Sequence, residues 1–94
     1  MLLGKKTKAP GDRKRYVLDY ENWLDDGETL DAVVYTVESG TATVDDDSIA
    51  GDGKSAIFFI NGGAVDTTFN VLVEATTTVG QVKNDHVEFV VREA

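Results

Sequence analysis

The residues that could carry hydrolytic chemistry are few and lie far apart in the sequence. His86 is the only histidine, and the chain has no cysteine, which excludes thiol nucleophiles, disulfides and thiolate metal sites. A serine nucleophile would need His86 as its base and an aspartate to orient the imidazole. The candidate serines are Ser39, Ser48 and Ser55. None of them stands in the G-x-S-x-G turn that presents such a nucleophile, so we expect His86 to be an ordinary surface residue.

Clustered aspartates and glycines suggest two other kinds of site. Asp45, Asp46 and Asp47, together with Asp52, could offer the oxygen ligands that Ca²⁺ prefers. Their spacing does not follow the EF-hand loop, and the sequence GDGK at 51–54 does not follow the phosphate-binding loop. We therefore expect solvated turn residues, no metal, no cofactor and no small-molecule substrate. A pair of catalytic carboxylates would need a cleft, for which a domain of this size has little room.

Trp23 is the only tryptophan, and it precedes Leu24 and the acidic turn 25–27. Its ring could stack on a sugar, or it could close the apolar core with its N–H bound to a backbone carbonyl. The aliphatic neighbour and the turn favour the core. We therefore expect Trp23 to be buried at the point where the chain crosses from one sheet to another.

Charge is distributed unevenly along the 94 residues, whose net charge is −8. Residues 1–15 contain six of the nine Lys and Arg and one acid, whereas residues 16–94 contain sixteen acids and three bases. This pattern predicts a flexible basic arm at 1–14, disordered when free, followed by one domain at 15–94. The candidate partner-binding residues of the arm and its border are Lys5, Lys6, Lys8, Arg13, Lys14 and Arg15. An acidic domain repels phosphate, so we expect an acidic protein neighbour and not nucleic acid.

No apolar segment is long enough to serve as a signal peptide or a membrane helix, because the longest unbroken apolar run is residues 56–60. We therefore expect synthesis in the cytoplasm, no membrane partner, and release only by lysis or on a particle.

Alternating apolar and polar residues dominate the rest of the chain. In 69–75 and in 87–91 every second residue is apolar, and turn-forming residues recur about every ten positions. No helical period is present. The fold class expected is all-β, an immunoglobulin-like antiparallel β-sandwich of about six or seven strands, with a bulge or bend near 31–32. The strands expected are 15–20, 29–38, 41–45, 54–61, 65–77 and 86–92, with a short one possible at 47–50.

One parity of each strand supplies the expected core. These residues are Trp23, Leu30, Tyr35, Val37, Phe58, Ile60, Phe69, Val71, Val73, Val87 and Phe89. Ile57 and Phe59 fall on the opposite parity, where two large apolar side chains exceed what a solvated strand needs. We therefore add Ile57 and Phe59 to the partner-binding candidates.

The order of several short motifs resembles a family of small tailed-bacteriophage structural proteins, the fiber-tail adaptor and related tail or neck proteins. The resemblance covers about residues 15–92. The matching residues are Asp19-Tyr20, Trp23-Leu24, Gly27-Glu28-Thr29-Leu30, Tyr35-Thr36-Val37, Gly62-Gly63 and Val87, Phe89 and Val91. Two positions depart from the pattern: Tyr35 replaces a more usual tryptophan, and the turn at 79–81 reads VGQ.

The resemblance implies an immunoglobulin-like fold and a non-enzymatic virion protein, a small adaptor joining tail, neck or fibre components in multiple copies. Its partners would be other virion proteins and copies of itself. The alternative is a ligand-binding sandwich for carbohydrate or a host surface. Such a module exposes several aromatic rings at one loop end or face, and the expected loops here contain almost none.

Overall fold

The computed structural model describes residues 2–93, apart from the side chains of Leu2, Leu3 and Lys5. Its regular structure consists of seven β-strands, with no helix among the described residues. In chain order they are β1 (Leu2–Lys8), β2 (Arg13–Asp19), β3 (Leu30–Val37), β4 (Thr43–Ile49), β5 (Ser55–Asn61), β6 (Thr67–Thr77) and β7 (Val82–Val91).

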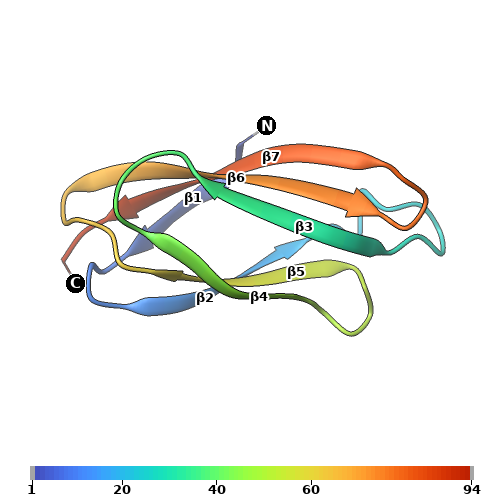
Figure 1. Ribbon diagram of the computed structural model, residues 1–94, viewed down its shortest axis with the longest axis horizontal. Helices are drawn as coiled ribbons and strands as arrows, with labels where there is room; N and C mark the ends of the chain where they lie inside the picture. The colour runs from blue at the N-terminus through green and yellow to red at the C-terminus, as the bar shows by residue number, and fades with distance from the viewer. Residues whose placement is uncertain (1, 94) are drawn as a thin grey trace.

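The strands form two sheets that pack face to face (Figure 1). One sheet has the order β1-β7-β6-β3 and the other the order β2-β5-β4. Edge strands β3 and β4 are neighbours on one side of the molecule, which leaves edge strands β1 and β2 together on the opposite side. The predicted all-β sandwich is confirmed.

The core lies between the sheets and follows the predicted alternation closely. Ala56, Phe58 and Ile60 of β5 are fully buried, whereas Ile57 and Phe59 between them are half-buried on the outer face. β6 and β7 alternate in the same way, because successive side chains of a strand point to opposite faces of its sheet. The rings of Phe69 and Phe89 stack with their centroids 5.3 Å apart.

Two irregularities in strand pairing shape the side formed by β3 and β4. The register of β3 against β6 shifts between Leu30 and Ala32, which confirms the predicted bulge. The register of β4 against β5 shifts between Asp45 and Ser48, and Asp46 has a φ of 47°. A single bulged strand therefore runs where the sequence suggests two short ones at 41–45 and 47–50.

β1 is a strand that the sequence pattern does not predict. It pairs parallel to β7, with Lys6 opposite Phe89 and Lys8 opposite Val91, whereas every other pair is antiparallel. The expected arm at 1–14 overlaps β1 and the start of β2, since both strands begin before residue 15. Disorder of this segment in the free protein stays a prediction. An edge strand rich in lysine needs no apolar alternation, because backbone hydrogen bonds to its one neighbour hold it.

The start of β7 also differs from the sequence-based expectation. Asn84 and Asp85 lie inside β7, which begins four residues before the expected strand 86–92, and the hairpin turns at 78–81, around the turn that the motifs place at 79–81. The backbone N–H of Thr77 donates to the carbonyl of Gln81 at 2.9 Å to close it. Asp85 is buried on the inward parity of β7, and an acid at a core position concealed the alternation of the strand.

Candidate functional site

Trp23 lies in the connection that carries the chain from β2 to β3, between the two sheets. A tight turn positions it, since the backbone N–H groups of Trp23 and Leu24 both donate to the carbonyl of Tyr20 at 3.0 Å. The indole packs edge-on against the Tyr20 ring at 6.1 Å. Trp23 is half-buried and packs against the core from outside. This corrects the expectation of a fully buried ring, because this end of the sandwich stays open beside it.

A hydrogen-bond network anchors the loop that follows Trp23. The buried carboxylate of Glu28 accepts from the Thr77 hydroxyl at 2.6 Å and from the Gln81 amide at 3.0 and 3.2 Å. It also accepts from the backbone N–H of Asp25 at 3.1 Å. The Thr77 bond, and after it the Asp25 bond, holds the pKa of Glu28 below its ordinary value. The network ties the loop at 25–28 to the β6–β7 hairpin.

A hollow of about 340 Å³ opens beside Trp23, between β1, β2 and β7. Its residues are Lys6, Val17, Leu18, Asp19, Tyr20, Asn22, Trp23, Lys83 and Val87. The Lys83 ammonium lies 5.8 Å from the centre of the Trp23 ring and 3.3 Å from a carboxylate oxygen of Asp85. Burial, with a smaller effect of the Asp85 charge, raises the pKa of Tyr20 to about 12. The hollow therefore combines aromatic walls with two lysines and a neutral phenol.

The outer face of the three-stranded sheet carries the apolar pair predicted from the sequence. Ile57 lies between Val17 of β2 and Ser48 of β4, and Phe59 lies between Arg15 and Asp45. Directly opposite residues in antiparallel strands share a face. Val17 is 49% exposed. The centre of this face is therefore apolar, and charged side chains flank it.

Arg13 makes intramolecular contacts across this same face, with two aspartates and an aromatic ring. Its guanidinium lies 4.1 Å above the centre of the Phe59 ring and 3.0 Å from a carboxylate oxygen of Asp45, and it also donates to Asp46. A cation over an aromatic ring is attracted to it. Arg13 and Phe59, both partner-binding candidates, are thus brought together, and each covers part of the other.

The other basic candidates occupy three different environments. Lys6, Lys14 and Arg15 are exposed. Lys8 is only 1% exposed, and its ammonium donates to the carbonyls of Ala9 at 2.7 Å and Gly62 at 2.8 Å. Burial lowers the pKa of Lys8, against an opposing effect of Asp12. The side chain of Lys5 lies outside the described residues. Lys8 therefore differs from the exposed contact that the sequence suggests, because its stem fills the end of the core.

The core candidates divide into enclosed and half-buried residues. The enclosed ones are Leu30, Phe58, Ile60, Phe69, Val71, Val73, Val87 and Phe89. Tyr35 and Val37 on edge strand β3 are half-buried, because that edge has no neighbour on one side. The Tyr35 ring packs on Phe58 at 4.8 Å, and burial raises its pKa.

The residues considered for catalysis are not brought together. His86 lies on the four-stranded sheet, whereas Ser48 and Ser55 belong to the three-stranded one. Asp45 and Asp46 bind Arg13, and Asp52 accepts from the backbone N–H of Lys54 at 3.0 Å. Within residues 2–93, no group of three His, Asp or Glu side chains is placed to hold a metal ion. That range also contains no helix capable of crossing a membrane.

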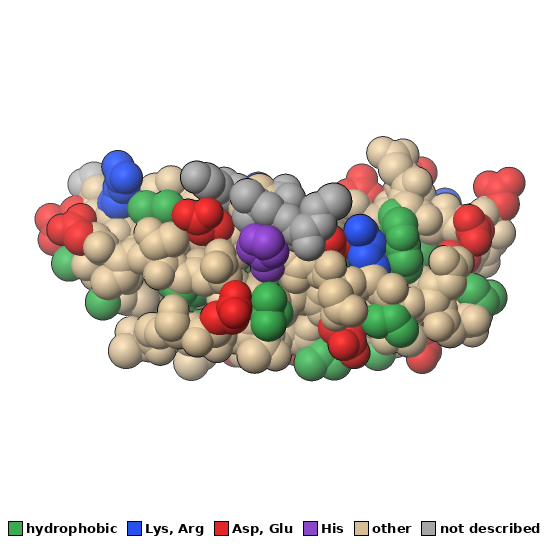
Figure 2. All heavy atoms as spheres, turned by 90° about the horizontal axis from the view of Figure 1, so that it is seen from above, with side chains coloured by type: hydrophobic (Ala, Val, Ile, Leu, Met, Phe, Trp, Pro, Cys, Tyr) green, Lys and Arg blue, Asp and Glu red, His purple; other side chains and the backbone are tan. Residues whose placement is uncertain are grey.

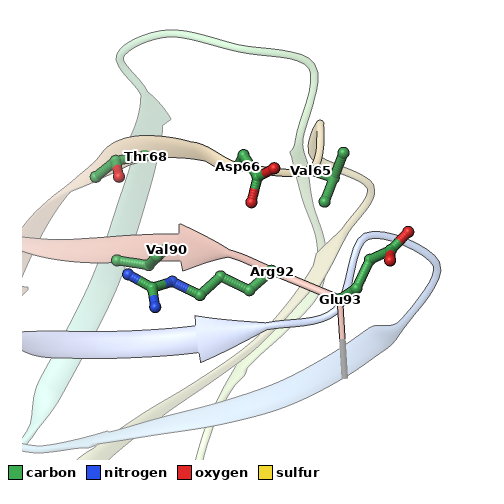
Figure 3. A pocket seen from close by; sticks show the side chains of 6 residues that line it. All are labelled: Val65, Asp66, Thr68, Val90, Arg92 and Glu93. Atoms are coloured by element: carbon green, nitrogen blue, oxygen red, sulfur yellow. The ribbon is translucent and has the colours of Figure 1, made fainter.

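The four-stranded sheet presents a face of mixed character. Acidic and apolar side chains are interspersed over the part visible in Figure 2. An open hollow of about 630 Å³ lies at the end of this sheet, formed by Val65, Asp66, Thr68, Val90, Arg92 and Glu93. Figure 3 shows Arg92 extending alongside Val90 while Glu93 points away. The arrangement has no set of convergent polar groups that would suit a defined ligand.

A sandwich with exposed apolar and charged surfaces, and no assembled catalytic group among its described residues, suits a protein that binds other proteins. A family model described as "Podophage GP4 fiber-tail adaptor protein gp77" matches residues 8–92. The chain belongs to this family. It is therefore a phage structural adaptor and a component of the virion, and proteins of this kind are typically not enzymes. No curated protein matches the chain.

The family match confirms the resemblance seen in the motifs and extends it from residue 15 back to residue 8. The adaptor also has site residues that the sequence pattern did not single out. Lys83 and Asp85 share the parity of Val87 and Phe89, and this spacing could have predicted that their side chains face the core side of the sheet. The Glu28–Gln81 contact had no such signal, because the two residues are far apart in the chain.

Proposed function

We propose that the adaptor joins tail and fibre proteins without catalysing a reaction, in multiple copies per virion, after synthesis in the host cytoplasm. The observation that carries the proposal is the outer face of the three-stranded sheet, where Ile57 and Phe59 lie side by side on the central strand. No strand of the described residues 2–93 covers this face, and contiguous apolar surface of this kind marks a protein contact.

Arg13 and Arg15 orient a bound partner at this face. Both arginines border Phe59, and Arg13 is already held by Asp45. An ordered guanidinium loses little freedom when a partner carboxylate binds it, so its entropic cost on binding is small. An acidic, partly apolar surface of a tail or fibre protein fits this arrangement.

The burial of the aromatic residues favours an adaptor over a carbohydrate-binding module. All eight aromatic residues lie in the described part of the chain, and none of them is exposed. Trp23, Tyr35 and Phe59 are half-buried, and they lie in different parts of the molecule. A sugar platform needs exposed rings that share one face.

The test replaces Ile57 and Phe59 together by serine, with Leu72→Ser as the matched control. Leu72 is an exposed apolar residue on the other sheet. We expect the double variant to fold, to lose binding to purified tail and fibre proteins in size-exclusion chromatography, and to be absent from assembled particles. The control should bind as the unmodified protein does. Incorporation of the double variant at the normal level would show that the adaptor binds through another surface.

A further inference from the structure

The sandwich separates its strand charges onto two opposite sides. β1 and β2, which form the first side, carry six of the nine Lys and Arg and a single acid, Asp19. β3 and β4, which form the second side, carry four aspartates and no Lys or Arg. We call these the basic side and the acidic side. Because each side ends in open strand edges, each is free to meet another chain.

One accessible cation of the basic side lies at the hollow beside Trp23. Lys8 is buried and Arg13 binds Asp45 and Asp46, which leaves Lys6, Lys14 and Arg15 as exposed cations among the described side chains of this side. Lys6 itself lines the hollow, together with half-buried Lys83. Trp23 and Val17 supply apolar surface between these cations. A partner that fits here is acidic and carries an exposed aliphatic side chain.

The acidic side of the same molecule has these properties. Asp31 and Asp47 are exposed, and neither β3 nor β4 contains a Lys or Arg that could pair with them. Val34 of β3 is 58% exposed and is one of the most exposed aliphatic residues among those described. Val33, Val34 and Val44 border a shallow hollow of about 250 Å³ with Asp47 at its rim. The two sides are therefore complementary in both charge and apolar content.

We propose that copies of the adaptor associate head to tail, the basic side of one copy against the acidic side of the next. This inference rests on the proposed presence of multiple copies. The contact is heterologous, so it generates a ring where the rotation closes and a filament where it does not. The bulge between Asp45 and Ser48 interrupts the edge of β4. A strand of the neighbouring copy therefore cannot pair regularly with β4 at this point, and side chains make that part of the contact.

The test uses charge reversal on each side. The first variant combines Lys6→Glu with Lys14→Glu, and the second combines Asp31→Lys with Asp47→Lys. Matched controls carry the same charge changes elsewhere: Lys54→Glu with Arg92→Glu, and Asp66→Lys with Glu93→Lys. Circular dichroism and thermal melting establish that each variant folds. Sedimentation velocity then measures association over a concentration series, in about 0.05 M and about 0.5 M salt.

We expect the unmodified adaptor to associate, more weakly in high salt, and both controls to behave like it. Each reversed variant alone should associate at least about tenfold more weakly, because like charges then face each other. A mixture of the two variants should recover association, since every contact between unlike copies is again complementary. Recovery by mixing is the result that mere damage to the fold would not give.

Three results would overturn the proposal: an unmodified adaptor that stays monomeric throughout the series, reversed variants that associate normally, or a mixture that does not recover. A basic side that binds an acidic tail or fibre protein while the adaptor stays monomeric would assign that side to a different partner. The Ile57 and Phe59 variant tests tail and fibre binding on another face, so failure of self-association and failure of the adaptor function can be told apart.

Discussion

Lys8 shows how one side chain can change role between sequence and structure. Its position among basic residues suggests an exposed contact, yet its ammonium binds two backbone carbonyls at the end of the core. The Gly62 carbonyl belongs to the turn after β5, far along the chain. Lys8 therefore joins the N-terminal strand to the three-stranded sheet, and it is the buried cation of that junction.

Replacing Lys8 by alanine should lower the free energy of unfolding by about 1–3 kcal/mol, the cost of leaving a buried acceptor without its donor. Lys6→Ala is the control, because Lys6 is exposed on the same strand, and we expect a change within about 0.5 kcal/mol. Urea denaturation measures both. Equal midpoints for the two variants would mean that the Lys8 bonds add nothing to stability.

Trp23 should contribute less than an enclosed aromatic residue does. Truncation of a buried Trp costs about 3–5 kcal/mol, whereas Trp23 keeps one face beside the hollow. We expect Trp23→Ala to cost about 1–3 kcal/mol, with Leu72→Ala, exposed on the other sheet, costing under about 0.5 kcal/mol. Thermal denaturation followed by circular dichroism compares the two. A Trp23 effect as small as that of Leu72 would place the indole outside the stabilising contacts.

Glu28 should make stability depend on acid. Its pKa is lowered in the folded state, chiefly by the Thr77 hydrogen bond, so the folded protein binds this proton less readily than the unfolded chain. Its contribution is therefore complete above the ordinary carboxyl pKa of 4.5, and it is lost as the pH falls through the lowered value. In Glu28→Gln this part of the acid dependence should disappear. Urea midpoints at a series of pH values from 7 to about 3 measure it, and identical pH profiles for the two proteins would contradict the assignment.

At the scale of elements, the seven strands differ in how firmly they are held. β6 and β7 are central strands with buried alternate residues, and they form a long hairpin. β1 is an edge strand that pairs only with β7, and beyond that ladder Lys8 ties its end down by the bonds to the Gly62 carbonyl at 2.8 Å and from the Arg92 N–H at 2.9 Å. β1 is also one half of the basic side, so its order bears directly on association.

Amide hydrogen exchange should show this difference. We expect β1 amides to exchange faster than those of β6, because an edge strand opens without disrupting the core. Their exchange should slow when copies associate, since the basic side is then covered. Protection of β1 equal to that of β6 in the dilute monomer would show that β1 is part of the stable core and needs no neighbour.

At the scale of the whole molecule, the core between the sheets encloses polar groups that remain neutral. Tyr16 and Tyr20 are buried and Tyr35 is half-buried, and burial raises the pKa of each phenol above its ordinary value of 10. The three residues lie on β2, just after it, and on β3. They therefore span both sheets, and their ionisation reports on the sandwich as a unit.

Alkali should therefore unfold the adaptor cooperatively. The neutral phenols stabilise the folded state fully below pH 10, and this contribution is lost as the pH rises from 10 towards and beyond the folded pKa, which is about 12 for Tyr20. Ultraviolet absorbance of tyrosinate, recorded with circular dichroism, should show ionisation coinciding with loss of the strands. Three phenols titrating near pH 10 in a folded protein would mean that they are solvated.

The sequence alone determined the class of fold and most of the central strands. In β6 alternate residues from Phe69 to Ala75 are apolar, and local alternation is sufficient to say which face is buried. In β5 both parities are apolar, and the polar turn that follows Ile60 is what assigned Ile57 and Phe59 to the outer face. The bulge near Leu30 follows from the break in parity there. The short motifs also indicated the family, because their order survives in the chain even though each is weak alone.

Only the tertiary structure decided which segments outside the alternating pattern become strands and which polar residues are buried. β1 forms because the free edge of β7 offers hydrogen bonds to a segment with no alternation of its own. Glu28 is buried because residues distant in sequence, Thr77 and Gln81, supply its partners, whereas buried Asp85 pairs with its near neighbour Lys83. The opposition of a basic and an acidic side arises in the same way. It depends on which strands become edges, and strand order is set by long-range pairing that no local pattern encodes.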